Sequence, residues 1–178
     1  MRAAIAAIIL TLATSSSGSL EHTVLYGVSV GSVRVSTGPQ TIPGLTEERL
    51  QSVVDGCLRE AGIEVDPAAP TVLWVGATVV VANSDPRLEL TPPQDAACFV
   101  TLDARLLEEA RLVRNGLRVE ASSWGRGAQV TMRVSMCADG VIAATRPLVA
   151  DFVETFRAMN PARDVDYGRR GRITTGCS

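Results

Sequence analysis

The sequence contains one histidine and no lysine among its 178 residues. Catalytic triads and most zinc sites need an imidazole held on a rigid element. The single histidine, His22, lies close to the N-terminus, where chains are often loosely held. We therefore expect no histidine-dependent triad, no metal site and no cofactor, and we expect that the protein is not an enzyme.

An excess of basic charge is also missing. All 17 cationic side chains are arginines, and 19 Asp and Glu residues give a formal net charge of -2 and a pI near 5.5. Proteins that bind nucleic acid present a basic surface to its phosphate backbone. The charge balance therefore predicts no nucleic-acid partner.

Long apolar runs are missing beyond the N-terminus, where Arg2 precedes an apolar stretch at 3–13 and small residues at 14–19. This order is typical of a secretory signal peptide cleaved between positions 13 and 19, with a buried N-terminal helix as the alternative. No cysteine lies near the exit to carry a lipid, and no other segment is apolar enough to span a bilayer. We therefore expect an exported protein, periplasmic or extracellular, whose mature chain has no transmembrane segment.

A helix followed by a very apolar strand is predicted in the first half of the chain. Thr46 is a suitable N-cap, and Leu45 and Leu50 are spaced as a hydrophobic staple. An apolar stripe at the 3.6-residue period follows, and Gly62 is placed to end the helix. Residues 71–82 then carry no charge, a pattern typical of a strand covered on both faces.

An earlier strand is predicted at 25–35, where side chains alternate between two faces. Strand, helix and strand in this order imply a right-handed parallel crossover. Gly27 and Gly31 lie in the first strand without the full spacing of a phosphate-binding loop. They are more typical of bulges or close packing.

Residues 98–113 fit two interpretations. Good helix formers occupy the second half, whereas the apolar residues share one face of an alternating strand. Asn115 followed by Gly116 is a strong signal for a two-residue hairpin turn and favours the strand. That turn predicts three cross-strand pairs: Leu112 with Val119, Ala110 with Ala121, and Arg111 with Glu120. Glu108 then lies on the apolar face as the one conflict.

The chain after the hairpin is less regular. Residues 125–127 predict a turn that ends the strand, and residues 128–137 fit either a further short strand or a loop. From Asp139 the apolar period becomes helical up to Asn160, which precedes a proline. Pro147 indicates either a kink in this helix or a helix that starts close to it.

Together these elements predict a single α+β domain over residues 22–161, followed by an irregular surface tail at 162–178. The element order β-α-β-β-β-α predicts a two-layer sandwich, in which a four-stranded mixed sheet carries two helices on one face. Residues 83–97 form the longest irregular stretch inside the domain. A loop of this length is either a binding segment or a tolerated insertion.

Three segments carry a resemblance to known proteins: GLTEERLQSVVDGCLREAGIEV at 44–65, ASSW at 121–124 and DFVETFRAMNP at 151–161. Together they resemble a group of uncharacterised small exported bacterial proteins. The element order is also similar to that of the lipopolysaccharide-transport assembly lipoprotein and of the N-terminal domain of TolB. The resemblance implies a four-stranded sheet with two helices on one face, used for protein contacts in the envelope. Unlike that lipoprotein, this chain has no cysteine placed for lipidation.

Four cysteines, none spaced as CxxC, are an even set in a chain expected to be exported, so disulfides are the default. In the predicted topology Cys98 begins a strand at the end of the sheet where the last helix starts near Cys137. Cys57 lies toward the opposite end, from which the tail with Cys177 departs. We therefore predict the bridges Cys98–Cys137 and Cys57–Cys177.

These features favour a non-catalytic envelope module that binds or assembles with an unknown partner protein. The alternatives are a small secreted enzyme that uses carboxylates and a disulfide-stapled structural or inhibitory domain. The candidate contact residues are Asp85 and Arg87 in the long loop, Trp124 at the end of the hairpin strand, and Glu108. A buried Glu108 would be the first group to consider in an enzyme. The sequence predicts no oligomeric state.

Overall fold

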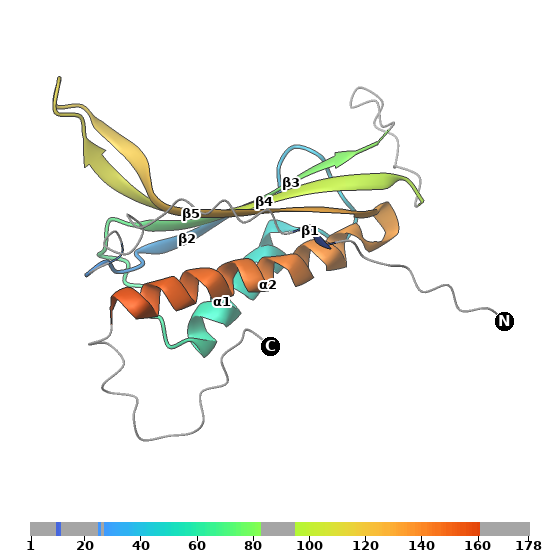
Figure 1. The fold of residues 1–178 in the computed structure, drawn as a ribbon, viewed down its shortest axis with the longest axis horizontal. Helices are drawn as coiled ribbons and strands as arrows, with labels where there is room; N and C mark the ends of the chain where they lie inside the picture. The colour runs from blue at the N-terminus through green and yellow to red at the C-terminus, as the bar shows by residue number, and fades with distance from the viewer. Residues whose placement is uncertain (1–9, 12–24, 26, 83–94, 161–178) are drawn as a thin grey trace, which may run out of the picture.

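The computed structural model describes residues 10–11, 25, 27–82 and 95–160. Its elements are β1 (Leu10–Thr11), β2 (Ser32–Ser36), α1 (Glu47–Glu60), β3 (Val72–Val81), β4 (Ala97–Arg111), β5 (Arg118–Arg133) and α2 (Val134–Met159). The sheet order is β1-β5-β4-β3-β2, in which β2 and β3 are parallel and the other pairs antiparallel. Both helices lie on the same side of the sheet (Figure 1). The predicted α+β sandwich, with four main strands in a mixed sheet, is therefore confirmed.

The two-residue strand β1 is an addition to the predicted fold. Leu10 pairs with Val130 and Thr11 with Gln129, so β1 forms the edge of the sheet beside β5. Both residues lie within the predicted signal peptide, whose removal would leave β5 as the edge strand. The rest of that peptide and the tail at 162–178 lie outside the described residues. In the described part of the chain, no helix is both long and apolar enough to cross a membrane.

The core lies between the sheet and the two helices. The inward-facing side chains of the central strands are enclosed: Leu73, Val75, Val100, Leu102 and Leu106. Each buried aliphatic side chain contributes on the order of 1.5–3 kcal/mol. Neither described helix covers the opposite face of β3, where Val80 is 56% exposed. The prediction of a strand covered on both faces is therefore wrong, because valine also favours strands that are buried on one side only.

Helix α1 begins and ends as the sequence predicts. The hydroxyl of Thr46 accepts a hydrogen bond from the N–H of Arg49 at 3.2 Å, which makes it the N-cap. At the other end Gly62 has a left-handed φ of 68°. The N–H of Ile63 donates to the C=O of Leu58 at 2.9 Å, the long hydrogen bond of a Schellman motif.

Strands β4 and β5 form the predicted hairpin, and residues 104–113 are not a helix. The register differs from the prediction by two residues, since Ala110 pairs with Val119. The turn is a four-residue loop at 113–116, in which Gly116 has a φ of 69° and donates its N–H to the C=O of Leu112 at 2.7 Å. Asn115 and Gly116 therefore close a longer loop than the two-residue turn that we predicted.

This register places like charges opposite one another. Glu109 faces Glu120, and Arg111 faces Arg118. Neighbours offset the repulsion: Arg118 forms an ion pair with Glu109 at 2.9 Å, and Glu120 lies 3.9 Å from Arg34 on β2. Exposed ion pairs contribute only about 0–1 kcal/mol each. These contacts therefore relieve repulsion but do not select the register.

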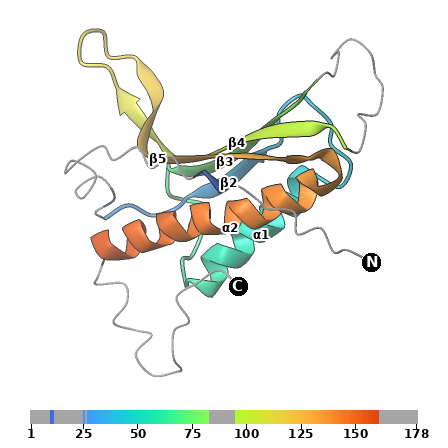
Figure 2. The same cartoon turned by 45° about the vertical axis from the view of Figure 1, so that its right-hand side comes forward.

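A β-bulge bends the hairpin. Leu106 pairs with Trp124 but Leu107 pairs with Ser122, which leaves Ser123 as the extra residue. Bulges bend the strand that contains them. Residues 107–122, here called the arm, turn away from the helix layer (Figures 1 and 2). The Ser123 hydroxyl donates to the carboxylate of Glu108 at 2.8 Å, which explains how a charged group is accommodated at this half-buried position.

Strand β5 is longer than predicted, and α2 starts earlier. Gly125 and Gly127 lie inside β5 and form no turn, and residues 128–133 are strand. Helix α2 starts at Val134 and continues through Pro147, so this proline does not start the helix. Proline cannot donate one of the helical hydrogen bonds. The helix persists because its apolar stripe, which includes the fully buried Phe152, packs against the sheet.

Candidate functional site

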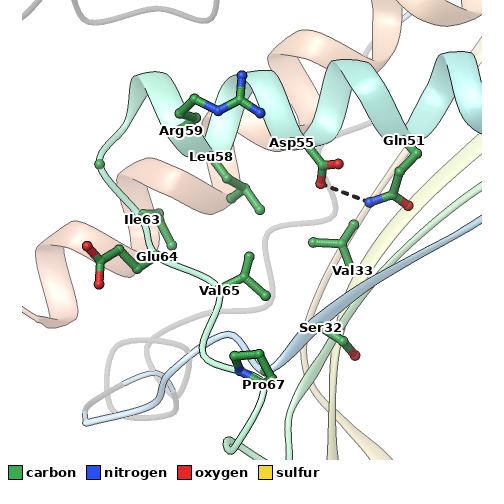
Figure 3. Close-up of a pocket in the computed structure, with 12 residues that line it drawn as sticks. Ser32, Val33, Gln51, Asp55, Leu58, Arg59, Ile63, Glu64, Val65 and Pro67 are labelled. Carbon is green, nitrogen blue, oxygen red and sulfur yellow. Dashed lines mark hydrogen bonds between the residues drawn. The ribbon is translucent and has the colours of Figure 1, made fainter.

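A groove lies between the second half of α1 and the start of β2 (Figure 3). Its volume is about 820 Å³, which is within the range of sites that hold small molecules. Three segments line it. They are the start of β2 with Ser32 and Val33, α1 with Gln51, Asp55, Leu58 and Arg59, and the connector after α1 with Ile63, Glu64, Val65 and Pro67.

The base of the groove is apolar. Val33, Leu58 and Val65 point into the space between the helix and the strand, each from a different segment (Figure 3). Leu58 belongs to the core, whereas Val65 is 40% exposed. The connector is held in place because Val65 forms a parallel bridge with Val30, whose C=O accepts the N–H of Asp66 at 2.8 Å. The groove thus offers a fixed apolar surface to a ligand.

Polar side chains form the rim of the groove. The Asp55 carboxylate accepts a hydrogen bond from the Gln51 amide at 2.8 Å, which holds it over the groove (Figure 3). Glu64 and Arg59 are exposed on the same rim. Two carboxylates against one guanidinium leave the rim with a net negative charge. A basic group therefore fits this rim better than an acidic one.

The edge of β2 beside the groove has backbone groups that pair with no strand in the described part of the chain. Ser32 donates its N–H to the C=O of Thr71 at 3.1 Å, in the direction of β3. Because successive peptide groups of a strand point to opposite edges, Val33 and Val35 direct their N–H and C=O away from β3. Within the described residues, no strand pairs with that edge. An open edge of this kind can accept a further strand.

The predicted contact residues do not line this groove. Trp124 is only 4% exposed and packs edge-to-face on Phe152, with 5.1 Å between ring centroids, so its prediction as a contact residue is wrong. Glu108 is half-buried at the base of the arm. Asp85 and Arg87 lie outside the described residues, and their role stays a prediction. No three His, Cys, Asp or Glu side chains gather as a metal site in the part of the chain that is described.

The structure brings Cys98 and Cys137 together but does not join them. Both are fully buried free thiols, and their side chains are hydrogen-bonded to each other. Burial raises the pKa of the Cys137 thiol to about 12, and the neighbouring Cys98 contributes to the rise. Cys57 is a buried residue of α1 itself, whereas its predicted partner Cys177 lies outside the described residues. Both predicted bridges therefore stay predictions.

The sequence reasoning missed the groove, although two signals for it are present. The first strand of a parallel crossover lies at the edge of the sheet when the second strand of that crossover continues into an antiparallel hairpin. The crossover helix then lies beside this edge strand. The short connector after α1 also carries the apolar Val65 and Pro67 among acidic residues. Neither signal shows how far the helix stands from the strand edge, which is what opens the groove.

Comparison with known proteins identifies no family. No protein-family model and no curated protein matches this chain. Among solved structures, a dodecamer of a PelC variant from Paraburkholderia phytofirmans is similar, with 17% sequence identity and a TM-score of 0.39. The match covers 73% of this chain and 88% of that chain. At this TM-score we draw no functional conclusion from the similarity.

Proposed function

We propose that this protein is an exported, non-catalytic module that binds a partner protein by adding an extended segment of that partner to the edge of β2. The observation that carries the proposal is the edge of β2 directly beside the groove, with which no strand of the described residues pairs. Strand addition at an exposed sheet edge is a recurrent mode of peptide recognition.

In the proposed complex, the partner segment pairs with the backbone groups of Val33 and Val35. Successive side chains of a strand point to opposite faces, so every second side chain of the segment enters the groove. There an apolar side chain contacts Leu58 and Val65. Main-chain hydrogen bonds supply affinity in this mode, and the groove supplies selectivity.

The charge of the rim further limits which partner segments can bind. Asp55 and Glu64 are the acidic side chains that line the groove, and Arg59 is its one basic side chain among the described residues. A partner segment with a basic residue next to its apolar anchor complements this arrangement. An acidic segment is disfavoured by the same charges.

Export is the second part of the proposal and rests on the charge, apolar run and small residues at positions 2–19. Intact-mass measurement of the protein secreted by a bacterial host tests it. We expect a chain shortened by cleavage between positions 13 and 19. A full-length product that stays in the cytoplasm contradicts export without bearing on the groove.

Random heptapeptides displayed on phage provide a defined probe for the groove. We expect the selected peptides to alternate β-branched residues with other side chains and to carry a basic residue. On binding, amide hydrogen exchange should slow at Val33 and Val35, because their N–H groups become paired. Peptides that bind without protecting these two amides would show that the edge of β2 is not the site.

A matched pair of variants separates strand pairing from side-chain contact. Val33→Pro removes the outward N–H, and proline is tolerated on an edge strand where the N–H faces solvent. Val33→Ala removes the same side-chain contacts but keeps the N–H. We expect Val33→Pro to bind the selected peptides roughly two- to tenfold more weakly than Val33→Ala, the effect of one lost hydrogen bond. Equal affinities would contradict strand addition.

A further inference from the structure

The arm ends in two exposed aliphatic side chains. Val113 is 102% exposed and Leu117 is 58% exposed. The loop that carries them lies at the far end of the hairpin, turned away from the helix layer (Figure 2). Large aliphatic side chains that cluster on an exposed loop indicate a contact surface.

Three arginines accompany these aliphatic residues: Arg111, Arg114 and Arg118. Arg111 donates from Nε to the C=O of Gly116 at 3.2 Å, which holds its guanidinium against the loop. Arg118 pairs with Glu109 at 2.9 Å, whereas Arg114 has no ion-pair partner among the described residues. The remaining carboxylates of the arm lie nearer to its base. The tip, residues 111–118, is therefore positively charged.

We infer that the tip of the arm docks on an anionic phospholipid surface. In this arrangement Val113 and Leu117 enter the interface between head groups and acyl chains, as apolar side chains of peripheral proteins do. The guanidinium groups around them bind the lipid phosphates, because the planar fork of arginine matches phosphate oxygens. This surface is separate from the groove and does not depend on the function proposed for it.

The composition of the tip favours a lipid surface over a protein partner. Energetically dominant residues of protein interfaces are enriched in Trp, Tyr and Arg and fill packed pockets near the interface centre. The tip has no aromatic residue. Its aliphatic side chains lie exposed on a projecting loop and are not part of a packed pocket. Two aliphatic groups and three arginines predict weak, reversible attachment that depends on salt.

Co-sedimentation of the purified full chain with lipid vesicles tests the inference. We expect binding to vesicles of phosphatidylglycerol and phosphatidylcholine, none to vesicles of phosphatidylcholine alone, and weaker binding as salt rises. Arg114→Ala should weaken binding roughly fivefold. Arg133→Ala removes an equal charge from the other end of β5 and should leave binding unchanged. An equal loss in the two variants, or equal binding to both vesicle types, would overturn the inference.

A second variant separates insertion from simple charge attraction. Val113→Ser combined with Leu117→Ser keeps every arginine and changes only exposed side chains, so an unchanged melting temperature is expected. Vesicle binding should fall at least as far as in Arg114→Ala. Full binding by this double variant would overturn insertion. Failure of the unmodified protein to bind phosphatidylglycerol vesicles would overturn lipid docking altogether and leave a protein partner for the tip.

Discussion

The thiol of Cys137 in the first turn of α2 is hydrogen-bonded to the thiol of Cys98 at the start of β4. Both residues are fully buried. Burial is the main reason why the pKa of Cys137 rises to about 12, and the hydrogen bond and charge of Cys98 raise it further. Two predictions for stability concern this pair, one for the reduced protein with two thiols and one for the oxidised protein with a bridge.

In the reduced protein, Cys137 should make the fold less stable at alkaline pH. Its pKa is about 12 in the fold, against 9.0 for an ordinary thiol. Above pH 9 the unfolded chain loses a proton that the folded chain keeps, so the free energy of unfolding falls as pH rises and is unaffected by this group below pH 9. Urea unfolding in reductant, on both sides of pH 9, measures the slope. Cys137→Ala should show a shallower decline, and equal slopes would argue against a buried neutral thiol.

Under oxidising conditions we expect Cys98 and Cys137 to form a disulfide. The two thiols lose two protons and two electrons to a disulfide oxidant such as oxidised glutathione, which is reduced to two thiols. Because both side chains are buried, the oxidant must react before α2 packs on the sheet. The bond should raise the free energy of unfolding by roughly 2–4 kcal/mol.

Peptide mapping without reductant detects this bond directly. Cys98→Ser is the control, because it keeps a hydrogen-bonding side chain of similar size and cannot be oxidised to the bridge. Combined with Cys177→Ser, which removes the other predicted bridge, its stability should not change between oxidised and reduced buffer. Two alkylatable thiols at 98 and 137 in the unfolded, oxidised protein would contradict the predicted bridge.

Asn160 joins the end of α2 to the segment before β2. Its Nδ2 donates to the C=O of Leu25 at 2.8 Å and of Phe156 at 2.9 Å, and its Oδ1 accepts the N–H of Gly27 at 2.9 Å. The side chain is buried, so Asn160→Ala removes three hydrogen bonds and leaves the N–H of Gly27 without this partner, while the C=O groups of Leu25 and Phe156 keep their bonds from the N–H of Val28 and of residue 160. We expect a loss of roughly 2–4 kcal/mol in denaturant unfolding. A loss below about 0.5 kcal/mol, the size of a surface substitution, would contradict this role.

Gly76 leaves room for the ring of Trp74 on the outer face of the sheet. A Cβ at position 76 would lie 2.3 Å from that ring, and Arg105 on β4 holds its guanidinium 5.6 Å from the ring centroid. Gly76→Ala should therefore destabilise the protein by about 1–3 kcal/mol. In a Trp74→Ala background the loss should shrink, because the clashing ring is gone. Unfolding of the four proteins measures the coupling, and additive losses would rule out the contact.

The type of each element could be predicted from local patterns, but the strand register could not. Asn115 and Gly116 indicated a hairpin correctly, and the helix alternative for 104–113 is wrong. The register of the arm follows from the four-residue loop at 113–116, and the extra residue Ser123 then shifts the pairing by one, so that Trp124 faces the core opposite Leu106. No local signal marks that bulge, because its stabilisation comes from the packing of Trp124 on Phe152 in α2.

The candidate site was harder to predict than the fold. Its lining comes from β2, α1 and the connector with Val65, so its shape depends on how the helix stands over the sheet edge. The sequence assigned contact roles to Trp124 and Glu108 from their type and position. In the structure Trp124 lies in the core, and the carboxylate of Glu108 accepts a hydrogen bond from the hydroxyl of Ser123.

On its own, the sequence determined the order of strands and helices and the limits of α1. These follow from interactions within a few residues, such as the Thr46 cap and the left-handed Gly62. Only the tertiary structure decided that the edge of β2 beside the groove is not paired by any described strand, and that the arm bends outward. These features depend on which surfaces remain after the apolar faces have packed, and packing joins residues far apart in the chain.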